Sequence, residues 1–372
     1  MELKGKVMIM KIMTKIEIIN QSNRTIEQLR AHYEIEKVLA NRLKHSSKEE
    51  RKYLYTELYD ELFRKVPDHP QLTTKTDMAS SVKRVTNEIS LLKPFITNKE
   101  ITFLEIGPGD CALSFEVAKY VKMVIAVDIS KEIVKNKFKP PNFELIISDG
   151  SSIDIVSNTV EVAYSNQLME HIHPDDAIIQ LQNIHRVLNP GGFYICITPH
   201  RYSGPHDISK YFDDVATGFH LKEYTYSELN SMFRSVGFSK IDVLLSYGRF
   251  NLKVPVWPFT VLETGINILP KKIKLKLSHT SLFQFFLGIK IVATKENHER
   301  TWRGKYERAS ERLSRFWRDV ERAWSTSRRC ARSRSERAHR GRQPAPRCDG
   351  RSYERSAYIH FQIVLIVVHG TC

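Results

Sequence analysis

The sequence lacks the features that would place it in a membrane or in an oxidising compartment. Its 372 residues contain only five cysteines, with no Cys-x-x-Cys pair and no other spacing typical of metal ligands. No run reaches the roughly 18 apolar residues that span a bilayer, and the nearest run, Ile363–Val368, is much shorter. Lys11 and Lys15 interrupt the apolar N-terminal segment, which therefore does not fit a signal-peptide core. We expect a soluble cytoplasmic protein without a disulfide framework or a bound metal.

The charge of the chain is unevenly distributed. The net charge is +15, but residues 298–372 contribute +10 of it, with 17 Arg and one Lys against eight acidic residues. Residues 1–297 carry only +5 and contain 29 Lys to 10 Arg. Because this larger part is only mildly basic, its charge does not by itself indicate a nucleic-acid-binding protein.

Residues 297–372 differ in composition from the rest of the chain. We interpret this Arg-rich tail as disordered or non-native, such as a fusion or a frame-shifted read-through, because residues 332–355 have few apolar residues and no periodicity. A basic amphipathic helix on an anionic membrane surface is the alternative. It is suggested by aromatic and aliphatic residues at helical spacing, namely Trp302, Tyr306, Ala309, Leu313, Trp317, Val320 and Trp324.

Residues 1–95 are predicted to form a helical extension. Apolar residues recur at helical spacing over about 25–43, 47–66 and 77–93. Ser46 and Ser47 each precede a glutamate by three residues, which makes them candidates for a capping box at the start of the second helix. The three helices either only pack on the rest of the protein or form a cap that helps to enclose a substrate.

Residues 96–296 alternate short apolar strands with helices. Strands are expected at about 101–106, 123–127, 143–147, 160–164, 193–198, 241–245 and 289–293, and helices at about 112–121, 130–137, 175–188 and 226–236. Repeated strand–helix units of this length predict an α/β fold with a doubly wound, mostly parallel, Rossmann-like sheet. An apolar insertion at about 247–287 separates the last two strands and is expected to form a pocket lid or a dimer contact.

The segment Phe103–Ala112 leads from a buried strand through a glycine turn into a helix. Gly107 and Gly109 supply tight-turn dihedral angles and let the backbone approach a ligand closely. The first N–H groups of the helix point back at the turn, as in sites for nucleotide-type ligands. With Asp128 about 20 residues downstream, the glycine pattern alone also fits a dinucleotide site.

Three further features favour a nucleotide-type ligand other than a dinucleotide. Glu105 lies inside the strand, where a dinucleotide-binding fold normally has an apolar residue. Asp149 and Gly150 end the third strand and offer an acceptor to an exocyclic amine. The turn Leu188–Gly192 precedes the fifth strand.

With these features the chain resembles the class I S-adenosylmethionine-dependent methyltransferases from about residue 100 to residue 296. The resemblance rests on five segments: Leu104–Gly109, Val127–Ser130, Ser148–Gly150, Met169–His171 and His185–Phe193. It implies a seven-stranded sheet whose last strand is antiparallel. It also implies that S-adenosylmethionine binds across the carboxyl ends of the first four strands.

The resemblance assigns nine residues to the cofactor site: Glu105, Gly107, Gly109, Asp128, Ile129, Asp149, Gly150, Asn166 and Leu168. Glu105 and the glycine backbone would hold the methionyl part, Asp128 the ribose hydroxyls and Asp149 the adenine amine. Ile129 would lie beside the adenine, and the two residues after the fourth strand would border the cofactor. Cys111 stands where many members have a third glycine, which affects how closely the backbone approaches the cofactor.

Methyl transfer from a sulfonium is an in-line displacement, so alignment and exclusion of water lower much of its barrier. A base is needed only if the acceptor must lose a proton. His171 is the candidate base, with His173, His200 and His206 as alternatives. In the family motif, however, the histidine at the position of His171 often only orders the loop.

The expected reaction is methylation of a small-molecule, lipid-like or glycan-precursor acceptor, at oxygen or carbon. The apolar insertion favours a hydrophobic acceptor, and no Asn/Asp-Pro-Pro-aromatic motif for amino-nitrogen methylation follows the fourth strand. Peripheral membrane contact through the insertion or the tail is a further expectation. Two alternatives stay open: an RNA methyltransferase that uses lysines 271–276, and a non-catalytic module that binds cofactor or lipid. The sequence does not specify the oligomeric state.

Overall fold

The computed structural model describes residues 24–73, 78–130, 138–247, 250–269 and 287–297, together with four helical residues of the tail. The chain divides into two units, Met1–His298 and Glu299–Cys372, and the fold below belongs to the first. Four predicted features lie wholly or partly outside the described residues: residues 131–137 of the helix expected at 130–137, residues 270–286 of the apolar insertion, the lysines at 271–276 and almost all of the Arg-rich tail.

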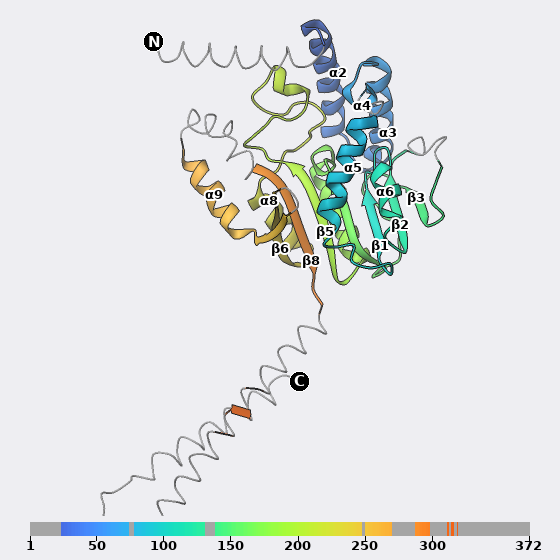
Figure 1. Cartoon of the computed structure of the whole chain (residues 1–372). Helices are drawn as coiled ribbons and strands as arrows, with labels where there is room; N and C mark the ends of the chain where they lie inside the picture. Colours follow the sequence, from blue (N-terminus) through green and yellow to red (C-terminus); the bar gives the residue numbers. More distant parts are fainter. Residues whose placement is uncertain are drawn as a thin grey trace, which may run out of the picture. The chain divides into compact units, whose positions relative to one another are not determined.

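Eight strands form one mixed sheet in the order β3-β2-β1-β4-β5-β8-β6-β7. Their bounds are β1 Thr102–Ile106, β2 Met123–Asp128, β3 Phe143–Ile147, β4 Val160–Asn166, β5 Leu188–Pro199, β6 Phe238–Tyr247, β7 Phe250–Pro255 and β8 Gly288–Lys295. Strands β1 to β5 pair in parallel, whereas β8 is antiparallel to both of its neighbours, β5 and β6. The predicted mostly parallel α/β sheet with an antiparallel last strand is therefore confirmed (Figure 1).

The sheet contains one strand more than the predicted seven. β7 forms an antiparallel hairpin with β6 and lies at the edge of the sheet. The sequence placed it inside the apolar insertion, and its Leu252 is 62% exposed. An edge strand with one neighbour buries few side chains, so it carries a weaker periodic pattern than a central strand.

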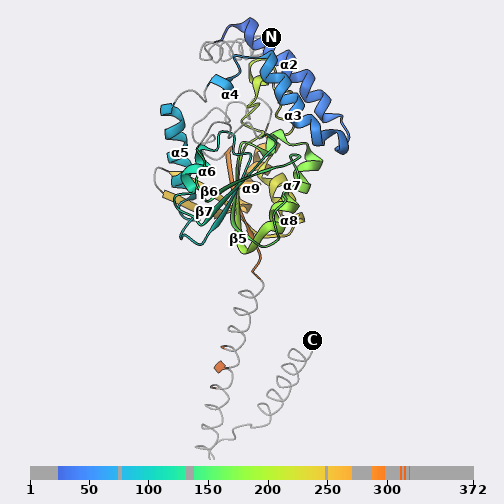
Figure 2. The same ribbon diagram turned by 90° about the vertical axis from the view of Figure 1, so that its right-hand side faces the viewer.

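Helices cover both faces of the sheet. Figure 2 shows α5 (Met78–Leu92) and α6 (Ala112–Val117) on one face, and α7 (Pro174–Val187) and α8 (Tyr226–Ser235) on the other. The consecutive residues Phe103 and Leu104 of β1 belong to different buried clusters, one shared with α5 and α6 and one with α7 and α8. β1 is therefore covered on both faces, as its continuous apolar run predicts.

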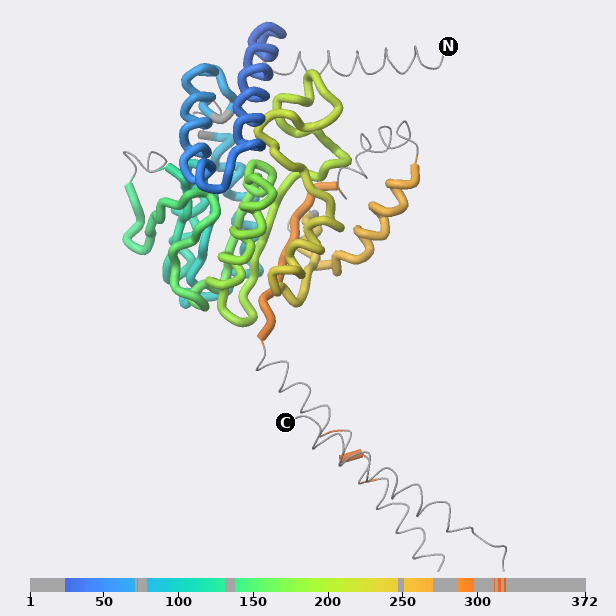
Figure 3. Tube along the Cα trace, turned by 180° about the vertical axis from the view of Figure 1, so that it is seen from behind, coloured from blue at the N-terminus to red at the C-terminus, as the bar shows by residue number. Residues whose placement is uncertain are grey.

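A pair of N-terminal helices lies at one end of the sheet. α2 (Ile26–Lys44) and α3 (Lys48–Lys65) stand there beside the short α4 (Pro70–Thr73), as Figure 3 shows from behind. Each helix begins with a capping box, and Ser47 is the residue that caps α3. Their buried leucines form a cluster with Phe219 and Leu221, which precede α8. We call α2 and α3 together the helical cap.

A buried ion pair fastens the helical cap to α7. Nε and Nη2 of Arg51 donate to the two carboxylate oxygens of Asp176 at 2.7 and 2.8 Å. The hydroxyl of Tyr55 donates to the same carboxylate at 2.8 Å. The Arg51 and Asp176 side chains are only 5% and 4% exposed. Such a bidentate, charge-assisted contact fixes the orientation of α3 as well as its position.

Part of the apolar insertion forms α9 (Trp257–Ile268), which follows β7. Phe259 and Ile266 are buried, whereas Trp257, Val261 and Ile268 are exposed on the opposite side of the helix. None of the helices in the described part of the chain has the length and apolar character to cross a membrane.

Candidate functional site

The carboxyl ends of the parallel strands β1 to β4 lie side by side at one end of the sheet, which we call the sheet edge. The predicted cofactor residues lie along it. Ile106 at the end of β1 pairs with Val127 of β2 and with Ser165 of β4. Asp128 at the end of β2 pairs with Ile147 of β3. The strand order reverses between β1 and β4, and in sheets of this type ligands bind beside such a reversal.

The glycine turn between β1 and α6 adopts left-handed backbone angles. Gly107 has φ +67° and Gly109 has φ +59°. A Cβ atom at Gly107 would approach Leu168 to 2.9 Å, whereas one at Gly109 would meet nothing within 4 Å. The backbone at Gly109 therefore borders open space that a ligand can enter. Buried Cys111 adopts φ +57°, so the residue in the third-glycine position keeps the backbone conformation that a glycine would favour.

Glu105 is a buried carboxyl group directly before this turn. Its side chain is on β1, is 5% exposed and accepts a hydrogen bond from the hydroxyl of Ser114 on α6. Burial raises the pKa of Glu105 to about 8, because the Ser114 hydrogen bond only partly offsets desolvation. A cationic ligand group beside it would stabilise the carboxylate.

Asp128 and Asp149 follow the ends of β2 and β3. Oδ1 of Asp128 accepts from the backbone N–H of Ser130 at 3.1 Å. Oδ1 of Asp149 accepts from the N–H groups of Ser151 and Ser152 at 3.0 and 2.7 Å. Although partial burial opposes it, these hydrogen bonds hold the pKa of Asp149 below its usual range. Both carboxylates are therefore oriented by their own loops at the ends of neighbouring strands.

The helical cap reaches the same loops. A Cβ atom at Gly150, which has φ +91°, would lie 3.1 Å from the Tyr55 ring. The hydroxyl of Thr56 donates to the carbonyl of Ile129 at 3.4 Å, and the Ile129 side chain packs against the cluster of the cap. The cap therefore covers part of the sheet edge where the predicted adenine-binding residues lie.

Two residues of α5 belong to this site although the sequence did not single them out. Nη2 of Arg84 donates to both oxygens of Asp110 in the glycine turn at 2.9 Å. Glu88 is buried and accepts from the side-chain amide of Asn166, and its burial raises its pKa. Arg84 and Glu88 are four residues apart on a predicted helix, but periodicity does not identify partners so distant in the chain.

His171 lies in the short 3-10 helix η3 (Met169–His171) that follows β4. Its Nδ1 is 3.0 Å from the Phe219 carbonyl and 3.1 Å from the Tyr59 hydroxyl. Because a carbonyl only accepts, Nδ1 carries the proton of the neutral ring. Burial lowers the pKa of His171 to about 3, so the ring stays neutral near pH 7 and is a weak proton acceptor.

His200, an alternative base, is completely buried. Its Nε2 is 2.7 Å from Oε1 of Glu263, and its Nδ1 accepts from the backbone N–H of Tyr202 at 3.0 Å. Both ring nitrogens are therefore occupied: the Nε2 contact joins the loop after β5 to α9, and the Nδ1 contact lies within that loop.

A cavity of about 200 Å³ lies among the loops that follow β5. Its lining residues come from the turn after β5 and from the segment before α8: Arg201, Gly204, Pro205, Asp214, Val215, Ala216, His220, Leu221, Lys222 and Glu223. The lining combines charged side chains with apolar ones. His220 connects the cavity to the 3-10 helix that carries His171, since their rings are 4.8 Å apart.

Comparison with known proteins finds similarity to methyltransferases. A family model described as a methyltransferase domain matches residues 104–196. A probable S-adenosylmethionine-dependent methyltransferase of Mycolicibacterium smegmatis is 25% identical over 142 residues, which are 38% of this chain and 53% of the relative. Ribosomal RNA small subunit methyltransferase A of Mycoplasma capricolum is 36% identical over 72 residues, 18% of this chain and 27% of the relative. The chain thus spans about half or less of the length of these curated relatives.

Among solved structures, phosphoethanolamine N-methyltransferase 1 of Haemonchus contortus matches with a TM-score of 0.46 and 13% identity. The match covers 68% of this chain and 50% of that protein.

Proposed function

We propose, from the match of residues 104–196 to a methyltransferase domain, that the chain is a class I S-adenosylmethionine-dependent methyltransferase that acts on a small-molecule or lipid-like acceptor. The observation that carries the proposal is Glu105, a carboxyl group buried directly before an open glycine turn. A buried carboxylate without a full counter-charge is costly, and a cationic ligand removes that cost. S-adenosylmethionine supplies the activated methyl group on a positively charged sulfonium.

We assign the cofactor contacts along the sheet edge. Glu105 and the backbone of Gly107 and Gly109 hold the methionyl part, and Asp128 accepts from the ribose hydroxyls. Asp149 accepts from the adenine amine beside Gly150 and Ile129, while Asn166 and Leu168 border the cofactor after β4. The register of β1 to β4 supports this assignment, since it sets these loops side by side.

The acceptor is proposed to be small or lipid-like for two reasons. The helical cap covers the loops after β2 and β3, which favours an enclosed site from which water is excluded. The exposed face of α9 is apolar at Trp257, Val261 and Ile268, which suits a lipid-like acceptor or contact with a membrane surface. We propose oxygen or carbon as the methylated atom.

His171 is proposed to order the loop after β4 rather than to act as the base. Its Nδ1 proton is committed to the Phe219 carbonyl, and burial lowers its pKa to about 3. The main contribution of this chain to catalysis is then the alignment of the acceptor with the sulfonium, and this alignment does not require a strong base.

Calorimetry with the full-length protein tests the cofactor assignment directly. S-adenosylmethionine is expected to bind with saturable heat, whereas NADH is expected to give none. Mass spectrometry of a lipid and small-molecule extract incubated with protein and cofactor should then reveal an acceptor that gains one methyl group. Binding of NADH in place of S-adenosylmethionine would refute the proposal, and cofactor binding without any methylated product would indicate a non-catalytic module.

RNA is the second candidate acceptor, because a stretch of 72 residues is similar to a ribosomal RNA methyltransferase. Residues 1–297 carry a net charge of only +5, which does not favour it. An RNA methyltransferase would bind RNA with an affinity that falls steeply with salt. We expect weak RNA binding by the full chain, and no methylation of RNA.

Asp128→Ala is expected to weaken binding of S-adenosylmethionine by about 1–3 kcal/mol, because the ribose hydroxyls lose their acceptor. Titration calorimetry of the variant beside the wild-type protein measures the change. Asp154→Ala is the matched control, since Asp154 is an exposed acid in the loop after β3. Unchanged affinity in Asp128→Ala would show that the ribose binds elsewhere.

A further inference from the structure

Two groups of potential metal ligands occur within the described residues, and neither includes a cofactor residue assigned above. One consists of His32, Glu36 and His69, the other of Glu170, His171 and His220. In each group the three residues offer one ligand atom apiece, and these atoms lie within 4.8 Å of one another. Their hydrogen bonds distinguish them.

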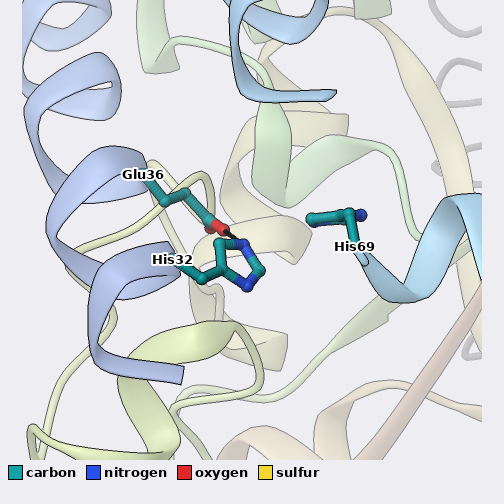
Figure 4. Close-up of side chains that lie close together, drawn as sticks. All are labelled: His32, Glu36 and His69. Atoms are coloured by element: carbon teal, nitrogen blue, oxygen red, sulfur yellow. Dashed lines mark hydrogen bonds and ion pairs between the residues drawn. The ribbon is translucent and has the colours of Figure 1, made fainter. Parts of the chain in front are cut away.

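Hydrogen bonds satisfy two residues of the first group, His32 and Glu36. Figure 4 shows His32 and Glu36 facing each other on α2, with His69 on the neighbouring segment. Nε2 of His32 is 2.7 Å from Oε2 of Glu36, and its Nδ1 is 2.9 Å from Nη1 of Arg24. Because arginine only donates, Nδ1 accepts and Nε2 carries the proton. The second oxygen of Glu36 accepts from the N–H of Phe219 at 2.8 Å, so the polar atoms of His32 and Glu36 have partners without a cation.

The second group contains an unsatisfied buried oxygen. Glu170 is completely buried, and its Oε2 accepts from the Thr198 hydroxyl at 2.8 Å. Its Oε1 has no hydrogen-bond partner among the residues that the structure describes. A buried carboxylate oxygen without a partner costs free energy, which indicates that another group binds there.

The two histidines of this group are oriented as metal ligands are. His171 donates its Nδ1 proton to the Phe219 carbonyl, and Nδ1 of His220 is 2.8 Å from Oε1 of Glu223. Their rings are 4.8 Å apart and nearly perpendicular. Donation of one ring N–H to a carbonyl or carboxylate is the usual arrangement around a metal-binding histidine, and it leaves Nε2 as the ligand atom.

We propose that Glu170, His171 and His220 bind a first-row divalent metal ion, with Zn²⁺ as the closest match. Two imidazole nitrogens and one carboxylate oxygen suit Zn²⁺, whereas Mg²⁺ and Ca²⁺ prefer oxygen ligands throughout. Ligand atoms about 2.0–2.2 Å from one ion in a tetrahedral site lie about 3.3–3.6 Å apart. Because the ligand atoms of this group lie within 4.8 Å of one another, the side chains would have to move together by at most about 1.5 Å to bind one ion.

The surroundings leave room for a further ligand on the ion. Of the three ligands, His220 lines the cavity of about 200 Å³, so the site lies beside a space that can hold a further ligand. Three protein ligands with an open position are typical of catalytic rather than structural zinc sites. The sequence did not predict this site, because His220 is distant in the chain from Glu170 and His171.

The test is calorimetric titration of the chelator-treated full-length protein with Zn²⁺ alone, without cofactor. We expect one ion per chain. Glu170→Gln and His220→Gln should each weaken binding at least tenfold, and Glu223→Gln should weaken it about 10- to 100-fold through His220. His69→Gln, a buried histidine of the other group, is the matched control and should bind as the wild type does. Circular dichroism verifies that each variant is folded.

Titration of the wild-type protein with Co²⁺ provides a second measurement that needs no variant. Histidine and carboxylate ligands in a four- or five-coordinate site should give visible absorption bands that Zn²⁺ abolishes. Absence of these bands and of saturable Zn²⁺ heat would overturn the proposal, as would binding that is lost in His69→Gln but kept in His220→Gln. Because no cofactor is present, failure here leaves the proposed methyl transfer unaffected.

Discussion

Glu105→Gln is expected to weaken binding of S-adenosylmethionine by about 10- to 100-fold. A hydrogen bond to a charged group contributes about 1.5–3 kcal/mol, and glutamine keeps the shape of the side chain but not its charge. Titration calorimetry at pH 7 on both proteins measures the difference. Glu144→Gln is the matched control, because Glu144 is an exposed glutamate on β3.

The pKa of Glu105 adds a second observable to the same experiment. Without ligand the pKa is raised to about 8, so the group is mostly protonated at pH 7. A cationic ligand favours the carboxylate, and binding should therefore release a proton. Titrations in buffers of different ionisation enthalpy count that proton, which the glutamine variant should no longer release. Equal affinity and equal proton release in both proteins would show that the cationic part of the cofactor binds elsewhere.

Measuring the stability of the ligand-free protein distinguishes a lost cofactor contact from misfolding of the Glu105→Gln variant. Between pH 4.5, the ordinary pKa of glutamate, and pH 8, the folded state holds a proton that the unfolded state has lost. The contribution of Glu105 to stability is thus present at low pH and is lost as the pH rises through this window. Because glutamine does not titrate, Glu105→Gln does not lose this stability as the pH rises. Above pH 7 the variant should therefore be at least as stable as the wild type.

Asp176→Ala is expected to lower the free energy of unfolding by about 3–5 kcal/mol. The substitution leaves the guanidinium of Arg51 buried between α3 and α7 without a counter-charge, and breaking a buried pair from one side costs about this much. Urea denaturation followed by circular dichroism measures the change. Replacing both partners, as in Arg51→Met with Asp176→Leu, should restore most of the loss, since no uncompensated charge remains.

The exposed pair of Arg42 and Glu57 offers a matched control within the same helical cap. These side chains are 45% and 58% exposed and lie 3.1 Å apart. Glu57→Ala should change stability by less than about 1 kcal/mol. If Asp176→Ala is equally mild, the buried pair does not fasten the cap. If unfolding instead splits into two transitions, the cap unfolds separately from the sheet.

Features that depend on residues close together in the chain were predictable from the sequence. The capping boxes of α2, α3 and α8 are formed by side chains three residues apart, so the local sequence specifies where each helix begins. The apolar run before Gly107 predicted a strand covered on both faces. The parallel direction of β1 to β5 followed from the repeated strand–helix units, which allow few topologies.

Contacts between distant segments were not predictable in the same way. Arg84 with Asp110 and Glu88 with Asn166 join α5 to loops far along the chain, and no local pattern selects these partners. The lowered pKa of His171 results from burial beneath the helical cap, which the sequence left open as a packing element or an enclosure. β7 was not predicted as a strand, because few side chains of an edge strand are buried and its sequence pattern is therefore weak.

The position of the helical cap in the chain has a consequence for how the protein folds during synthesis. Arg51 and its partner Asp176 are 125 residues apart, and Glu36 and its partner Phe219 are 183 residues apart. The ribosome therefore releases α2 and α3 long before the surface that buries their leucines. β8 lies between β5 and β6 and is the last of the described strands to be made. Closing such long loops is slow, so the helical cap reaches its final packing only after Phe219 has been made, and the sheet only after β8 has been made.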